Sequence, residues 1–167
     1  MSQIKTARNE AGFTLVELAL TVVIALVISI MVVRFWITTS EAFILDTNIV
    51  TLKQQSERTI EIMSEKIRRA NAATIVVSNG NSTIDFVDTF DGAAVRYEFQ
   101  PPAPGGPPWG QIVQTASGMQ VVLASYVENL QFTATPTGLV SVTAAFQTGS
   151  GNAQSRLTSQ FSASARN

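Results

Sequence analysis

Residues 13–33 form an apolar segment of 21 residues in which Glu17 is the only charged residue. A transmembrane helix needs roughly 20 such residues. A secretory signal peptide has an apolar region of only about 7–15 residues, followed by a cleavage site of small residues. The bulky residues Arg-Phe-Trp at 34–36 stand here instead. The segment therefore predicts one membrane-spanning helix within residues 13–34.

The residues before this segment predict its orientation. Lys5 and Arg8 make the N-terminal flank basic, which places it in the cytoplasm and the rest of the chain outside. A plain single-span anchor accounts for this pattern but leaves Glu17 unexplained. A carboxylate within a membrane segment is costly, and it is typically paired and functional.

Glu17 ends the pattern Gly-Phe-Thr-Leu-Val-Glu at 12–17, which lies between the basic leader and the apolar segment. This arrangement resembles the N-terminus of type IV prepilins and type II secretion pseudopilins. In that family a prepilin peptidase cuts after the glycine and methylates the new N-terminal amine. The resemblance implies that residues 1–12 are a leader, that cleavage follows Gly12, and that Phe13 is N-methylated. It also implies that Glu17 acts in filament assembly.

Charge pairing gives this implication a physical basis. Cleavage after Gly12 creates an amine at Phe13 with a pKa of about 7.7–8, so that it is mostly protonated at neutral pH. Glu17 lies four residues further on. In apolar surroundings, the amine of one subunit and the carboxylate of a neighbour attract each other strongly. Removing one of the two leaves the other charge without a partner, which is costly. We therefore expect Glu17 to make assembly depend on prior cleavage and to set the axial stagger of the subunits.

Composition limits the remaining functions. The 167 residues suffice for one anchor and one modest domain. The chain has no cysteine, no histidine and a net charge of −1. Disulfides and thiolate metal sites are excluded, and the commonest general base is missing. We therefore expect no enzyme activity, no cofactor and no metal site, and nothing in the composition suggests binding to nucleic acid.

The helical pattern continues after the span. Apolar residues recur at helical spacing as one stripe that only Ser56 interrupts: Leu45, Ile49, Leu52, Ile60, Met63 and Ile67. No proline precedes Pro101, and no glycine lies between Gly12 and Gly80. The pattern predicts one helix of roughly 90 Å over residues 13–72. Residues 35–72 are its amphipathic half, and the stripe should face a domain.

Residues 73–167 predict a β-rich domain because the period changes to two. Asn79-Gly80 is typical of a hairpin tip. The predicted strands are residues 74–77, 83–87, 94–100, 119–123, 130–134, 140–146 and 157–163. The sheet should be mostly antiparallel, with one face on the helix stripe and the other in water. The fold class is therefore α+β, with a long N-terminal helix packed on the sheet, as in pilins.

Two surface features leave alternatives open. The proline-rich loop at 101–110 should be a stiff connection with Trp109 tucked onto the domain; alternatively, Trp109 is an exposed contact for a neighbouring subunit. The acidic residues Asp85, Asp88 and Asp91, with Glu98 nearby, could offer oxygen ligands to calcium. Their spacing matches no recognised calcium loop, and a solvated hairpin edge is the preferred interpretation.

A second, looser resemblance points within the family. Residues 121–132, Val-Val-Leu-Ala-Ser-Tyr-Val-Glu-Asn-Leu-Gln-Phe, and the final Arg166-Asn167 resemble PilW-type minor pilins and pseudopilin J. Gln114 departs from that pattern, where arginine is common. This resemblance implies a minor subunit, at or near the filament tip, that helps to initiate assembly.

The implied partners are the peptidase/N-methyltransferase, other minor and major pilins or pseudopilins, the inner-membrane assembly platform and membrane lipid. The implied location is the inner membrane, single-pass with a cytoplasmic N-terminus, and then the pilus or pseudopilus. Two alternatives remain. One is a membrane-anchored extracytoplasmic binding domain that is never cleaved, and the other is a secreted binding module with a calcium site near Asp88.

Overall fold

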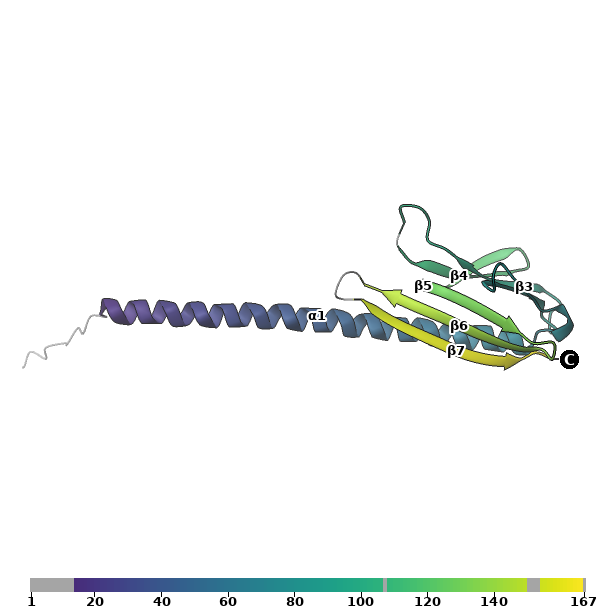
Figure 1. The fold of residues 1–167 in the computed structure, drawn as a ribbon, viewed down its shortest axis with the longest axis horizontal. Coiled ribbons are helices and arrows are strands. Elements are labelled where there is room, and N and C mark those ends of the chain that lie inside the picture. Colours follow the sequence, from purple (N-terminus) through teal and green to yellow (C-terminus); the bar gives the residue numbers. More distant parts are fainter. Residues whose placement is uncertain (1–13, 107, 150–153, 167) are drawn as a thin grey trace, which may run out of the picture. The chain divides into compact units, whose positions relative to one another are not determined.

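The computed structural model describes residues 14–106, 108–149 and 154–166 (Figure 1). The chain divides into two compact units, one within Met1–Ala42 and one within Phe43–Asn167. Phe13 and the leader lie outside the described residues. Helix α1 (Leu15–Arg68) belongs to both units, and every strand lies in the second.

The predicted continuous helix is confirmed from Leu15 to Arg68. It ends four residues before the predicted residue 72, because the chain turns there to join the sheet. The N–H groups of Arg69 and Ala70 donate to carbonyls three residues back, which tightens the last turn. Ala70 then forms a bridge with Asp88. The helix thus ends where the chain begins to pair with the sheet.

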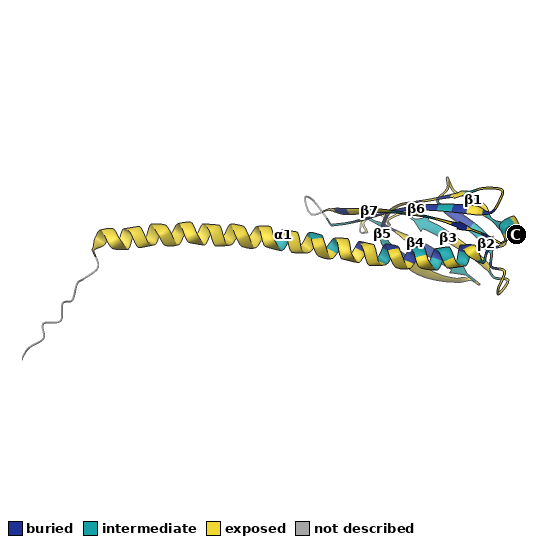
Figure 2. Ribbon diagram, turned by 90° about the horizontal axis from the view of Figure 1, so that it is seen from below, coloured by how far each residue is buried: buried dark blue, intermediate teal, exposed yellow. Residues whose placement is uncertain are grey.

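The first unit is a helix with apolar side chains on all sides. Its large apolar residues from Leu15 to Ile37 are 45–84% exposed, so no described part of the chain covers them (Figure 2). The hydroxyl of Thr21 donates to the carbonyl of Glu17, and that of Ser29 donates to the carbonyl of Ala25, each at 2.7 Å. Both hydroxyl donors are therefore satisfied within the helix, without water. By length and composition this helix can span a membrane, which fits a single-pass anchor.

The second unit contains one antiparallel sheet in which the strands follow their chain order. A short 3₁₀ turn, η1 (Ala72–Thr74), leads from α1 into it. The strands are β1 (Val76–Ser78), β2 (Thr83–Val87), β3 (Ala94–Gln100), β4 (Gly110–Ala116), β5 (Met119–Ala134), β6 (Leu139–Thr148) and β7 (Ser155–Ser164). This confirms an α+β fold.

The predicted hairpin at Asn79-Gly80 joins β1 to β2, and the strand predicted at 94–100 is β3. Strand β4 had no prediction of its own. Strand β5 joins the two strands predicted at 119–123 and 130–134. Extra residues interrupt its pairing with both neighbours, and Tyr126 has a φ of 62°. Bulges of this kind bend a strand without ending it.

The core lies between the second half of α1 and one face of the sheet. The buried helix residues are Leu52, Ser56, Thr59, Met63 and Ile67. They face large side chains that are fully buried in the sheet, including Tyr97, Phe132 and Phe146. The predicted stripe is therefore confirmed at Leu52, Met63 and Ile67.

Two details of the predicted stripe are wrong. Ile49 is 51% exposed, and Thr59 is more buried than its neighbour Ile60. Ser56, which seemed to interrupt the stripe, belongs to it: its hydroxyl hydrogen-bonds to the hydroxyl of Ser159 on β7. A buried hydroxyl with a partner is tolerated in a core, and sequence periodicity alone does not reveal the partner.

Gly110 occupies a place with no room for a side chain. A Cβ there would lie 2.4 Å from the Phe99 ring and 2.6 Å from the Gln100 carbonyl oxygen. We expect Gly110→Ala to lower the free energy of unfolding by about 1–3 kcal/mol, since overpacked atoms must move. Urea unfolding measures this. The control is Gly106→Ala in an exposed loop, where a Cβ would lie 3.2 Å from the Ala103 carbonyl oxygen, a milder conflict that should cost clearly less. Equal losses would contradict the packing argument.

Candidate functional site

Glu17 lies in the first turn of α1 and closes a reciprocal cap with Thr14. The N–H of Thr14 donates to Glu17 Oε2 at 3.1 Å, and the Thr14 hydroxyl donates to the same oxygen at 3.2 Å. In the other direction, the N–H of Glu17 donates to Thr14 Oγ1 at 3.3 Å. This is a capping box, in which a threonine before the helix and a glutamate three residues later satisfy each other's free N–H groups.

The cap uses only one carboxylate oxygen of Glu17. Both bonds from Thr14 end on Oε2, and no described residue donates to Oε1. Gly12 and Phe13, the residues predicted for cleavage and methylation, lie outside the described residues. The described geometry therefore leaves one oxygen of Glu17 available to a further donor.

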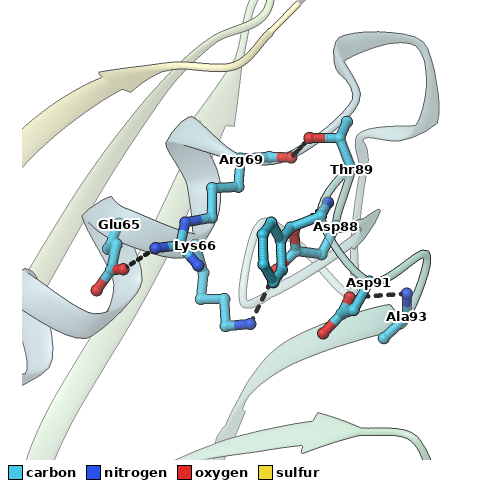
Figure 3. A network of polar contacts seen from close by, with 8 residues as sticks. Glu65, Lys66, Arg69, Asp88, Thr89, Asp91 and Ala93 are labelled. Atoms are coloured by element: carbon cyan, nitrogen blue, oxygen red, sulfur yellow. Dashed lines mark hydrogen bonds and ion pairs between the residues drawn. The ribbon is translucent and has the colours of Figure 1, made fainter.

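A second polar site joins the C-terminal end of α1 to the loop between β2 and β3 (Figure 3). Asp88 in this loop is fully buried, and its Oδ2 accepts a hydrogen bond from Lys66 Nζ at 2.8 Å. Its Oδ1 accepts one from the N–H of Phe90 at 2.9 Å. Lys66 lies on α1 with 29% of its side chain exposed. Each carboxylate oxygen of Asp88 therefore has a partner.

These partners decide the charge state of Asp88. Burial alone raises the pKa of a carboxyl group because it disfavours the charged form. The hydrogen bonds from Lys66 and Phe90, with the positive charges of Lys66 and Arg69, outweigh burial, and the pKa of Asp88 lies below its ordinary 3.8. Asp88 is thus a buried carboxylate that is stabilised as an anion by the end of α1.

The loop around Asp88 is tied to the helix at several further points. The N–H and the hydroxyl of Thr89 both donate to the carbonyl of Arg69, at 2.8 and 2.7 Å. The Arg69 guanidinium lies 5.6 Å from the ring centre of Phe90 and also pairs with Glu65. The two bonds from Thr89 thus satisfy the carbonyl of Arg69, directly after the end of α1, and tie the loop to the helix.

The structure separates the predicted acidic cluster into different pairings. Asp85 pairs with Arg96, whose Nε lies 2.7 Å from Asp85 Oδ1, and Asp91 accepts a hydrogen bond from the N–H of Ala93. The prediction of a solvated edge is wrong for Asp88, which is buried. Within the described residues, no three acidic side chains gather into a group that could hold a metal ion.

Trp109 lies just before β4 and is half-buried. It lines a shallow groove with Gln100, Gln111 and the loop residues Pro101, Pro102 and Ala103. The described loop residues from Pro101 to Gly106 are exposed. Partial burial fits the predicted packing of Trp109 onto the domain, and its role as a subunit contact stays a prediction.

The sequence contained a signal for one of these contacts that the predictions did not use. The spacing from Thr14 to Glu17 is that of a capping box before an apolar run, so the cap was readable. The pairing of Lys66 with Asp88 was not, because 22 residues separate them and only the register of the sheet brings them together.

Comparisons of the chain with protein-family models, with curated proteins and with solved structures found no match.

Proposed function

We propose that this chain is a minor subunit of a type IV pilus or of a type II secretion pseudopilus. In this proposal, a prepilin peptidase removes residues 1–12 and methylates Phe13, and the mature chain then enters a filament. The observation that carries the proposal is a carboxylate, Glu17, at the N-terminal end of a helix that is apolar on all sides. It stands in the pattern Gly-Phe-Thr-Leu-Val-Glu.

The exposed apolar surface of residues 15–37 supports this proposal. Such a surface needs lipid before assembly and other helices after it. A helix that leaves lipid for a bundle of similar helices keeps its apolar surroundings, so the transfer is not opposed by exposure to water. The charged end of the helix then needs a partner inside the bundle.

Glu17 can find that partner without losing its cap. Thr14 holds Oε2, and Oε1 is left for the methylated amine of a neighbouring subunit. Before cleavage no such amine exists at Phe13, because its nitrogen is part of the peptide bond to Gly12. Cleavage therefore creates the donor that assembly uses.

The role of a minor subunit that helps to initiate assembly rests on the loose resemblance of residues 121–132 and of the C-terminus. Its partners would be other minor and major subunits, the assembly platform of the inner membrane and, through Trp109, a neighbouring subunit. In this proposal the N-terminus starts in the cytoplasm and the sheet domain lies outside.

The capping box favours one alternative, an uncleaved membrane anchor that carries a binding domain. In that case Glu17 serves only its own helix, through Thr14. The cap gives Glu17 a local role that needs no second subunit. This alternative predicts that cleavage never takes place and that the chain stays in the membrane.

Fractionation distinguishes these two functions. We expect the tagged chain to appear in sheared filaments only when its cognate prepilin peptidase and assembly platform are present. Without the peptidase it should remain in the membrane fraction. A chain that stays in the membrane in both cases, while the other subunits form filaments, would support the uncleaved anchor.

A further inference from the structure

Strand β7 is the last strand of the sheet and pairs with β6 on one side only (Figure 1). Its residues pair one-to-one with β6 without a bulge, from Ser164 with Leu139 to Ser155 with Thr148. Among the described strands, none pairs with its other side. Just beyond the strand, Arg166 forms a bridge with Asn71 and exchanges hydrogen bonds with Ala70 and Ala72, so the open edge is that of Ser155–Ser164. About half of the N–H and C=O groups of β7 therefore point away from the sheet.

This edge has few of the usual protections against pairing with another chain. Proteins blunt exposed edges with short strands, prolines, charged side chains, bulges, inward-pointing charges or a covering helix or loop. Strand β7 has 10 residues and contains neither proline nor lysine. Its one charged residue, Arg156, is held by Glu128, with Nε 2.8 Å from Oε2. The opposite edge, β1, has only three residues, which is itself a protection.

The side chains of β7 indicate what kind of strand could lie beside it. On the inner face, Leu157 and Phe161 are only partly buried against the core, and Ser159 between them bonds to Ser56 of α1. An added strand would need apolar residues beside Leu157 and Phe161 and a small residue beside Ser159. Strand β6 already presents this pattern on the other side, with Phe146, Ala144 and Val142.

We infer that the free edge of β7 accepts an extended segment of another protein chain as an eighth strand. The backbone groups of the edge select an extended main chain, and the inner-face side chains select the order apolar, small, apolar at every second residue. The outer face is uncharged at Thr158, Gln160 and Ser162, so charge does not drive the contact. This inference does not depend on the proposed function, which concerns the N-terminal end of α1.

A peptide with the sequence of Leu139–Thr148 tests the inference because it carries this pattern. The probe is fluorescent, flanked by Glu-Lys pairs for solubility, and titrated into the full-length protein in detergent. In each of two further peptides, every second residue is N-methylated. One peptide is methylated on the residues whose N–H groups would face β7, and the other is methylated on the residues between them. Methyl groups on the edge that faces β7 remove its donors, so we expect one methylated peptide to bind at least tenfold more weakly and the other to bind as the parent does. No binding of the parent, or equal behaviour of the two methylated peptides, would overturn the inference.

A disulfide experiment tests the position of the added strand. The chain has no cysteine, so Gln160→Cys introduces its only thiol. A peptide with cysteine at the position of Thr143 should then form a disulfide with it, since Thr143 is the neighbour of Gln160 in β6.

Gln131→Cys is the matched control. Gln131 is exposed and lies in the same row across the sheet, beside Thr143, but in the interior strand β5. A disulfide with Gln160→Cys alone is the expected result. Disulfides with both variants, or with neither, would contradict docking at the edge of β7. Leader cleavage is unaffected in every case, so failure here leaves the proposed function standing.

Discussion

Replacing Lys66 with methionine should lower the free energy of unfolding of the sheet domain by about 3 kcal/mol. Lys66→Met keeps most of the apolar stem but removes the ammonium that lies 2.8 Å from Asp88 Oδ2. Asp88 then remains as a fully buried carboxylate without its main counter-charge, which is the costly outcome for a buried pair. Urea unfolding of the full-length protein in detergent measures the loss.

Two comparisons separate this effect from a general effect of lost charge. Lys53→Met removes an equally charged residue from α1, but its pair with Glu57 is exposed and 3.9 Å long, so we expect a change below about 0.5 kcal/mol. In the Lys66→Met background, Asp88→Asn should recover part of the loss because it removes the stranded charge. Equal losses for Lys66→Met and Lys53→Met would show that the pair does not hold the domain together.

The same pair makes a signed prediction for pH. The pKa of Asp88 is lowered in the folded protein, so the unfolded chain takes up this proton first as the pH falls. The contribution of ionised Asp88 to the free energy of unfolding is therefore complete at pH values well above the ordinary carboxyl pKa of 3.8. It decreases as the pH falls through and below that value. Asp88→Asn should flatten the stability profile over that acidic range.

Removing the charge of Glu17 should reduce incorporation into filaments by more than about tenfold, since losing one partner of a pair in apolar surroundings costs several kcal/mol. Glu17→Gln is the informative substitution. Its amide oxygen can still accept the hydrogen bonds from Thr14, but it carries no charge for the amine of a neighbouring subunit. We expect Glu17→Gln and Glu17→Ala to be equally defective when the tagged chain is quantified in sheared filaments.

Thr14→Val is the matched control for this experiment. It removes the hydroxyl of the cap, and the N–H of residue 14 can still donate to Glu17. If Glu17 acts between subunits, Thr14→Val should be incorporated nearly as well as the unmodified chain. If Glu17 acts only as a cap, Glu17→Gln should function and Thr14→Val should be impaired, and that outcome would contradict the assembly role.

Much of the fold was predictable because it depends on local periodicity. The change from helical spacing to alternation after residue 72 predicted the helix and most of the strands, and Asn79-Gly80 predicted the first hairpin. Strand β4 escaped prediction because its neighbours in sequence are prolines and glycines. The bends of β5 escaped as well, since a bulge depends on pairing with two other strands and not on its own sequence.

The candidate sites divide in the same way. Gly12, Phe13 and Glu17 were identified from one contiguous pattern, and Thr14 could have been added from the capping-box spacing. The contacts of Asp88 and Ser56 could not be foreseen from the sequence. Lys66 and Ser159, their partners, are 22 and 103 residues away in sequence, and only the folded sheet brings each pair within hydrogen-bonding distance.

The intact mass of the membrane-extracted protein, produced with and without its prepilin peptidase, shows whether the leader is removed. We expect the peptidase to remove residues 1–12 and the mature chain to carry one additional methyl group, located on Phe13 by fragmentation. An unchanged full-length mass in the presence of an active peptidase, shown by cleavage of another subunit in the same cells, would contradict this expectation.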